Sequence, residues 1–141
     1  AGELPGAECY CGQRGCIETF LSGPAMARDH FDHTGRHLDA AAIAARDLDG
    51  DRDAGDTLSR YEERLARALS AAINIIDPDC IVLGGGVSNI ARLYRNVPRL
   101  WQRHVFADKV DTALKPPRHG DASGVRGAAW LWPGSNDGSG A

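Results

Sequence analysis

The longest periodic pattern of hydrophobic residues lies between residues 58 and 76. Hydrophobic side chains recur there at steps of three and four residues, the spacing of one face of an α-helix. They are Leu58, Tyr61, Leu65, Leu69, Ala72, Ile73 and Ile76. The opposite face is charged, with pairs such as Glu63 and Arg67 at the spacing of ion pairs along a helix. The pattern predicts a long amphipathic helix that ends before Pro78.

Two shorter helices are predicted before this one. Ser22, or the glycine after it, can cap a helix in which Pro24 occupies the first turn and residues 25–33 continue. Asp39 can cap an alanine-rich helix over residues 40–48. The polar stretch that follows, residues 50–53, predicts a turn.

The C-terminal half of the chain predicts alternating strands and helices. Residues 80–83 are apolar and β-branched between proline and glycine residues, which predicts a buried parallel strand. Residues 110–114 are a candidate second strand. Hydrophobic spacing predicts a helix from residue 88 to residue 101 that Pro98 kinks or divides. A last helix is expected over residues 122–132.

Composition limits the class of protein. The 141 residues are 43% hydrophobic and 25% charged, as expected for one globular domain, here residues 1–133, with a flexible polar tail over 134–141. The net charge of −3 offers no basic surface for nucleic acid. No apolar run is long enough to cross a membrane, and no secretory leader opens the chain. We therefore expect a cytoplasmic protein without membrane or nucleic-acid partners.

Three of the four cysteines, Cys9, Cys11 and Cys16, fall within eight residues. Zn²⁺ favours cysteine sulfur in a tetrahedral site, and glycines between these cysteines allow a tight turn. Three ligands do not close a structural site, so a fourth must come from elsewhere. The alternative is three unrelated reduced thiols. The remaining cysteine, Cys80, lies in an apolar segment and is interpreted as a small core residue.

Two further segments are candidates for ligand binding. Glu18 follows the last of these cysteines by two residues, so a bound metal would hold its carboxylate in place. This carboxylate could anchor sugar hydroxyls, or it could simply favour the positive end of a helix. Gly84, Gly85 and Gly86 lie between a predicted strand and a helix, where side chains would block a nucleotide. The alternative is a plain strand-to-helix turn.

The cysteine segment resembles a known family. Its pattern Cys-x-Cys-Gly-x-x-Gly-Cys-x-Glu, over residues 9–18, is similar to the zinc signature of ROK proteins, which are sugar kinases and sugar-responsive repressors. Residues 77–89 resemble the nucleotide-side segment of the family, and residues 119–129 resemble its closing helix. The sequences of residues 9–12 and 130–133 are most similar to the bacterial fructokinase branch of this family.

The resemblance implies an α/β fold: the C-terminal lobe of an actin-like, ribonuclease-H-like ATPase, helix-rich because the opening strands are absent. It implies that Glu18 binds the sugar, that Gly84–Gly86 line the ATP pocket, and that Zn²⁺ is structural. The fourth zinc ligand would be a histidine upstream of Ala1. His30 and the two histidines after it match no ligand position and are expected to be solvated at the surface.

The resemblance also implies a function. We expect the C-terminal part of an ATP-dependent hexose kinase, with fructokinase as the best single prediction and the sugar 6-OH as the acceptor. ATP, Mg²⁺ and Zn²⁺ are the expected cofactors. Because the catalytic aspartate precedes the cysteines in the family, no catalytic residue is expected in this chain, which would be inactive alone. The expected partners are a hexose, the N-terminal half of the same protein and a second copy in a homodimer.

Two other classes stay open. A ROK transcriptional repressor shares the cysteine motif but adds an N-terminal helix-turn-helix. A non-catalytic, zinc-stabilised binding module would have the cysteine motif without kinase activity.

Overall fold

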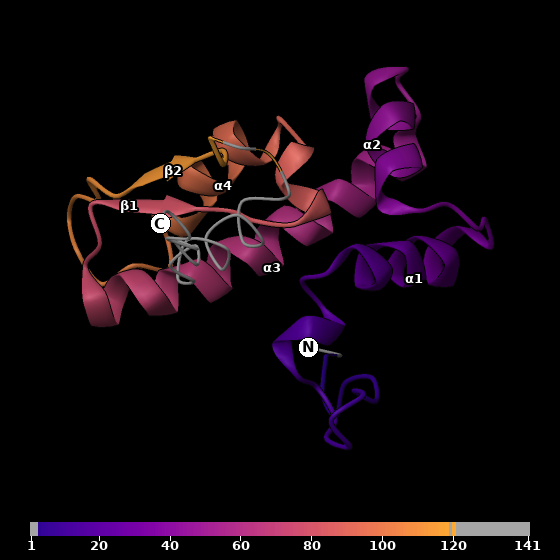
Figure 1. Cartoon of the computed structure of the whole chain (residues 1–141), viewed down its shortest axis with the longest axis horizontal. Coiled ribbons are helices and arrows are strands. Elements are labelled where there is room, and N and C mark those ends of the chain that lie inside the picture. Colours follow the sequence, from indigo (N-terminus) through magenta and orange to yellow (C-terminus); the bar gives the residue numbers. More distant parts are fainter. Residues whose placement is uncertain (1–2, 119, 121–141) are drawn as a thin grey trace, which may run out of the picture.

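The structure is a computed structural model that describes residues 3–118 and 120. Its α-helices are α1 (Gly23–Thr34), α2 (Ala40–Leu48), α3 (Arg52–Ile76) and α4 (Leu93–Trp101), and its strands are β1 (Cys80–Val82) and β2 (Ala113–Lys115). Two short 3-10 helices, η1 (Ile17–Thr19) and η2 (Gly86–Asn89), complete the elements of the described residues. The long helix α3 packs against α1, α2 and α4, and the two strands lie along its C-terminal half (Figure 1).

The predicted starts of α1 and α2 are confirmed. Ser22 Oγ accepts a hydrogen bond from the Ala25 amide at 3.1 Å, and Asp39 Oδ1 accepts one from the Ala42 amide at 2.7 Å. Each side chain satisfies an amide that the first turn of a helix leaves without a partner.

The predicted turn over residues 50–53 is only partly correct. Asp51 caps α3, because its Oδ1 accepts from the amides of Asp53 at 3.0 Å and Ala54 at 3.3 Å. The helix therefore begins at Arg52, well before the first residue of the hydrophobic stripe. Helix capping by an aspartate thus extends α3 into a segment whose polarity predicted a turn.

The predicted stripe of α3 forms the centre of the core. Its buried members are Leu58, Tyr61, Leu65 and Ile73, and they pack with residues of α2 and α4. The stripe does not stay buried to its end, because Ile76 is 70% exposed. The helix stops there at Asp77, which adopts a left-handed conformation just before Pro78.

The charged face of α3 does not form the predicted pairs along the helix within the described residues. Arg60 instead donates to Asp29 of α1 at 2.8 Å, and Arg67 donates to Glu3 at 2.8 Å. Glu63 pairs with the segment that follows α4. These long side chains therefore join α3 to other segments rather than stabilise one isolated helix.

The two strands form a parallel pair, with α4 in the connection between them. Cys80 lies opposite Ala113, and Val82 lies opposite Lys115. A second strand was predicted over residues 110–114, and the strand observed lies slightly later in the chain.

Residues 80–82 form a strand, but the prediction that this strand is buried is wrong. Ile81 and Leu114 face the core, whereas Cys80 is exposed and Val82 is 58% exposed. Cys80 is therefore not a core residue in the described structure. The physical reason is that side chains alternate across a strand, and helices of the described part cover only one face of this pair.

The helix predicted from residue 88 begins later, at Leu93, after the 3-10 helix η2. Pro98 does not divide it, because α4 is continuous through this residue. Proline removes one amide donor, but its fixed φ is compatible with a helix. Val97 and Trp101, both buried, hold this short helix against the core.

His30 was expected at the surface, but it is completely buried between α1 and α3. Its Nδ1 lies 2.9 Å from Thr57 Oγ1, which itself donates to the Asp53 carbonyl at 2.9 Å. Because Thr57 has one hydroxyl proton, His30 Nδ1 is the donor in this pair. Burial lowers the pKa of His30, so the ring is neutral near pH 7.

The predicted closing helix over residues 122–132 and the predicted tail over 134–141 lie outside the described residues. Within residues 3–118 and 120, none of the helices combines the length and the apolar character needed to span a membrane.

Candidate functional site

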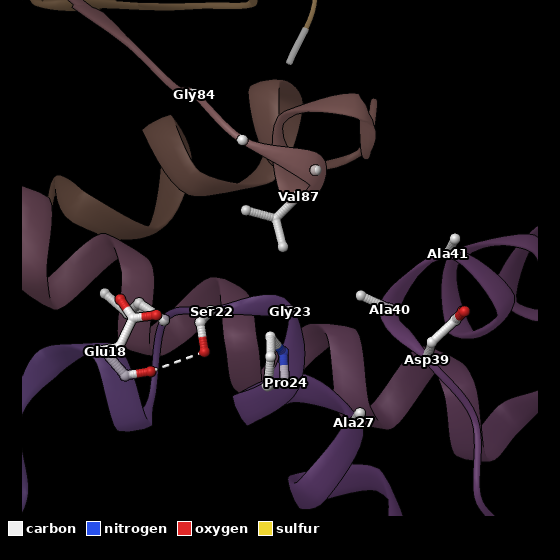
Figure 2. Close-up of a pocket in the computed structure, with 13 residues that line it drawn as sticks. Glu18, Ser22, Gly23, Pro24, Ala27, Asp39, Ala40, Ala41, Gly84 and Val87 are labelled. Atoms are coloured by element: carbon white, nitrogen blue, oxygen red, sulfur yellow. Dashed lines mark hydrogen bonds between the residues drawn. The ribbon is translucent and has the colours of Figure 1, made fainter. Parts of the chain in front are cut away.

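A cavity of about 660 Å³ opens between the N-terminal ends of α1 and α2 and the turn that follows β1 (Figure 2). This volume is in the usual range for small-molecule sites. The lining residues are Glu18, Leu21, Ser22, Gly23, Pro24, Ala27, Asp39, Ala40, Ala41, Gly84, Gly85, Gly86 and Val87. The two segments predicted separately to bind ligands, Glu18 and the three glycines, therefore line one cavity.

The three glycines form the wall of the cavity that follows β1. Gly85 has a φ of 74°, a conformation that favours glycine, and its carbonyl accepts from the amide and hydroxyl of Ser88. Gly84 and Gly86 do not have a positive φ, and a side chain at either position would meet no atom of the described residues within 4 Å. Internal packing of the described residues therefore does not explain these two glycines, whereas close approach of a ligand would.

Glu18 lies on η1, with its carboxylate beside the cavity (Figure 2). Its backbone carbonyl accepts from Ser22 Oγ at 2.8 Å, so Ser22 joins η1 to the start of α1. Within the described residues, the carboxylate has no hydrogen-bond or ion-pair partner. It is exposed and can accept hydrogen bonds from a ligand.

Glu18 also affects the neighbouring core. Burial, together with the negative charge of Glu18, raises the pKa of Tyr61 to about 12. The Tyr61 hydroxyl therefore stays protonated and donates to the Leu21 carbonyl at 3.2 Å. This bond connects α3 to the segment that carries the cavity wall between Glu18 and α1.

Cys9, Cys11 and Cys16 gather as the sequence predicted. Their sulfur atoms lie within 4.8 Å of one another, and the Cys11 and Cys16 sulfurs are 3.5 Å apart. Four sulfurs around a tetrahedral Zn²⁺ would be about 3.8 Å from one another. The three thiols thus fit three corners of a zinc site. Within the described residues the cluster has no fourth ligand.

The thiols of this cluster influence each other's protonation. A hydrogen bond from the Gln13 amide, followed by one from Cys16, lowers the pKa of Cys11. The hydrogen bond with Cys11 raises the pKa of Cys16 to about 11. Cys11 therefore loses its proton more readily than Cys16 does. A metal ion binds thiolates, so its binding would release the protons of these thiols.

A small hairpin holds the cysteines in place. Glu8 and Arg14 form an antiparallel bridge, and their side chains pair at 3.0 Å. The Cys9 amide donates to the Gln13 carbonyl at 2.8 Å. The backbones of Gly6 and Gly15 pack closely together. A Cβ atom at Gly6 would lie only 2.5 Å from the Gly15 Cα, so this position has no space for a side chain.

Part of the cavity wall is not predicted by the sequence. Asp39 was assigned only as a helix cap, yet it also lines the cavity, next to Ala40 and Ala41 of α2. Pro24 was assigned only to the first turn of α1, and it lines the same space. The sequence indicates that a helix starts at both positions. It does not indicate that the two helix starts face the same cavity.

Comparisons with known proteins show which family the chain resembles. Residues 3–135 match the sequence model of the ROK family. The chain is 37% identical over 129 residues to the N-acetyl-D-glucosamine kinase of Salmonella typhi, an alignment that covers 92% of this chain and 43% of that protein. The chain thus spans less than half the length of this relative.

Solved structures share the fold. A ROK family glucokinase from Streptomyces griseus in complex with glucose and AMPPNP superposes with a TM-score of 0.79 at 22% identity, covering 89% of this chain and 47% of that one. A ROK family transcriptional regulator, homologous to the E. coli MLC protein, superposes with a TM-score of 0.67 at 23% identity, covering 80% and 32%. The predicted helix-rich α/β fold, part of an actin-like sugar-kinase fold, is confirmed. The chain belongs to the ROK family.

Proposed function

We propose that this chain is part of an ATP-dependent sugar kinase that phosphorylates the 6-OH of a hexose or an N-acetylhexosamine. The observation that carries the proposal is the single cavity that contains both Glu18 and the Gly84–Gly86 turn. Support comes from the 37% identity to a protein named N-acetyl-D-glucosamine kinase and from the shared fold of a glucokinase in complex with glucose and AMPPNP.

In this proposal, the chain supplies binding walls for both substrates. The Glu18 carboxylate accepts hydrogen bonds from two neighbouring sugar hydroxyls and so orients the ring. The Gly84–Gly86 turn leaves space for the nucleotide, which can approach the backbone because no side chain intervenes. Holding two reactants side by side is a large part of catalysis of phosphoryl transfer.

The transfer step needs a base that this chain is not expected to supply. The base takes the proton of the 6-OH, the sugar oxygen forms a bond to the γ-phosphorus, and the bond between that phosphorus and ADP breaks. The ROK resemblance assigns this role to an aspartate that precedes the cysteines, so we expect the chain to be inactive by itself. Mg²⁺, when bound, neutralises charge on the phosphates.

We further propose that Zn²⁺ binds Cys9, Cys11 and Cys16, with a histidine upstream of Ala1 as the fourth ligand. The ion would be structural, since four protein ligands leave no position for a substrate. Because Glu18 follows Cys16 by two residues, the metal would also fix the position of the sugar-binding carboxylate.

The assembly of the whole protein is part of the same proposal. We expect the chain to act with the N-terminal half of the same protein, in the cytoplasm, and as a homodimer. Size-exclusion chromatography with light scattering on the full-length protein tests the dimer, which a monomeric mass would contradict.

The test is a coupled ADP-release assay on the full-length protein with fructose, glucose, mannose, N-acetylmannosamine and N-acetylglucosamine. Residues 9–12 and 130–133 resemble the fructokinase branch and so favour fructose, whereas the Salmonella typhi relative is named for N-acetylglucosamine. Turnover highest with fructose would support the fructokinase prediction. Turnover highest with another of these sugars would support the kinase and reject fructose. No turnover with any of them would contradict the proposal.

A transcriptional repressor is the second candidate, because a ROK regulator shares the fold. The sequence upstream of Ala1 separates the two functions: a helix-turn-helix favours the repressor, and a strand opening with Asp-x-Gly-x-Thr favours the kinase. A non-catalytic binding module is the third, and ATP binding by the full-length protein would exclude it.

A further inference from the structure

A second acidic residue, Asp39, lines the cavity, and the proposed function does not use it. Asp39 lies on the α2 side of the cavity, and Glu18 lies on the η1 side, with Ser22 and Pro24 between them (Figure 2). Asp39 Oδ1 accepts from the Ala42 amide at 2.7 Å. Within the described residues, the other oxygen, Oδ2, has no partner, so one half of this carboxylate is available to a ligand.

Asp39 lies near the glycine turn. A side chain at Gly23 would contact Ala40 Cβ at 3.7 Å and Val87 Cγ1 at 4.0 Å, so the starts of α1, α2 and η2 converge there. Asp39 directly precedes Ala40, and Val87 directly follows the glycines. The part of a nucleotide that contacts the glycine turn would therefore also lie within reach of α2.

The charge of the cavity wall indicates which part of a nucleotide it can accept. Glu18 and Asp39 are acidic, and among the described lining residues none is lysine, arginine or histidine. A triphosphate beside these carboxylates would be repelled unless cations from elsewhere neutralise it. Uncharged hydroxyl groups, in contrast, donate hydrogen bonds to a carboxylate.

We propose that Asp39 recognises the ribose of the nucleotide, an inference that rests on the proposed kinase function. Its Oδ2 accepts a hydrogen bond from a ribose hydroxyl, while Oδ1 continues to cap α2. Carboxylates fulfil the same role in dinucleotide-binding folds, where an acidic residue binds the ribose. The small apolar side chains beside Asp39, those of Ala27, Ala40 and Ala41, leave space for the adjoining base.

The helix cap makes this carboxylate a rigid acceptor. The bond from the Ala42 amide restricts the side chain before any ligand binds, so little conformational entropy is lost when a hydroxyl meets Oδ2. Asp39 would thus set a preference for ribonucleotides over deoxynucleotides. Glu18, which belongs to the sugar side, would not.

The test measures nucleotide binding to the full-length protein by isothermal titration calorimetry. ATP, 2′-deoxy-ATP and 3′-deoxy-ATP are compared in the wild type and in Asp39→Ser. Serine retains a cap oxygen for α2 but has no second oxygen. We expect the wild type to bind ATP about 10- to 100-fold more tightly than at least one deoxynucleotide. Asp39→Ser should bind all three with the same, weaker affinity.

A matched control is Asp51→Ser, the same change at the cap of α3, a residue that does not line the cavity. This variant should keep the preference for ATP. Equal binding of the three nucleotides by the wild type, or a preference that survives in Asp39→Ser, would overturn the inference.

The calorimetry does not depend on turnover, so it separates this inference from the proposed function. Ribose discrimination that Asp39→Ser removes, in a protein that phosphorylates no sugar, would support the role of Asp39 and reject the kinase. Failure of the wild type to bind any of the three nucleotides would overturn both.

Discussion

Glu18 is held in place by its backbone, whereas its carboxylate has no hydrogen-bond or ion-pair partner among the residues that the structure describes. The Ser22 hydroxyl donates a hydrogen bond to the Glu18 carbonyl oxygen at 2.8 Å, and the short helix η1 places the carboxylate beside the cavity. We predict that Glu18→Gln lowers kcat/KM for the sugar about 10- to 100-fold, because one acceptor for a sugar hydroxyl becomes a donor. The KM for ATP should change less than about twofold, as steady-state kinetics of the full-length protein would measure.

The matched control is Glu8→Gln in the same loop. Glu8 pairs with Arg14 at an exposed position and does not line the cavity. Glu8→Gln should leave kcat/KM for the sugar and the KM for ATP nearly unchanged. If Glu18→Gln impaired sugar and ATP use equally and also lowered the melting temperature, the mutation would have disturbed the loop rather than sugar binding.

Asp51 gives a prediction about pH. A hydrogen bond from Arg36 lowers the pKa of this α3 cap to about 2 from its ordinary 3.8. Because the folded pKa is the lower one, the charge of Asp51 stabilises the fold above about pH 4, and this contribution is lost as the pH falls toward about 2. Asp51→Asn keeps a cap oxygen without the charge. Thermal unfolding should therefore show it less stable than the wild type at about pH 6, with a difference that shrinks below about pH 4.

A stability difference that stays constant down to about pH 2 would show that the Asp51 charge is not responsible. Arg36→Gln is the partner control, since it removes the group that lowers the pKa of Asp51. Its stability difference from the wild type should shrink over the same pH range.

Largely buried ion pairs of Arg92 join α2, α3 and α4. Arg92, at the start of α4, donates to both oxygens of Glu62 on α3, at 2.7 and 3.1 Å, and to Asp47 of α2 at 2.7 Å. Asn96 also donates to Glu62. The Glu62 side chain is only 4% exposed. This pair therefore fixes α4, and the glycine turn before it, against α2 and α3.

We predict that Glu62→Ala costs about 3–5 kcal/mol in the free energy of unfolding, because it leaves the Arg92 charge half-buried without its main partner. Urea denaturation of the full-length protein would measure the loss. The control is Ser59→Ala, which removes the 3.3 Å bond from Arg92 to an exposed hydroxyl, together with the 2.8 Å bond from that hydroxyl to the Gly55 carbonyl of the same helix, and should cost less than about 1 kcal/mol. A similarly small loss for Glu62→Ala would show that water replaces the pair.

Ion pairs also attach the cysteine hairpin to the rest of the molecule. Glu3 accepts from Arg64 at 3.0 Å and from Arg67 at 2.8 Å, both on α3. Arg64 also donates to Asp29 of α1 at 2.8 Å. The segment before the cysteines is therefore tied to two helices, and a metal in the hairpin would stiffen the same connection.

If Zn²⁺ binds the cysteines, Cys11→Ser should lower the zinc content and the melting temperature of the full-length protein together, because structural zinc stabilises the folded state directly. Metal analysis by mass spectrometry and thermal unfolding would measure both. Cys80→Ser is the control, since Cys80 is exposed and outside the cluster. Unchanged zinc in Cys11→Ser would reject the assignment of that ligand.

Much of the local structure could be predicted from the sequence. The starts of α1 and α2, the central part of α3 and the gathering of three cysteines followed from capping residues, periodicity and spacing. Each depends on residues a few positions apart, so the chain near each element contains the necessary information. The errors at the start of α3 and at α4 lie at element ends, where a cap or a 3-10 turn changes the boundary.

Only the tertiary structure decided which residues meet. The sequence by itself identified Glu18 and the glycine turn as candidates, but their common cavity depends on how α1 and α2 pack near η2. Tertiary contacts also buried His30, exposed Cys80 and turned the arginines of α3 toward other segments. Local pattern determines the elements of this chain because their hydrogen bonds are local. Burial and ion pairing depend on segments far apart in the sequence, and periodicity does not specify which of them become neighbours.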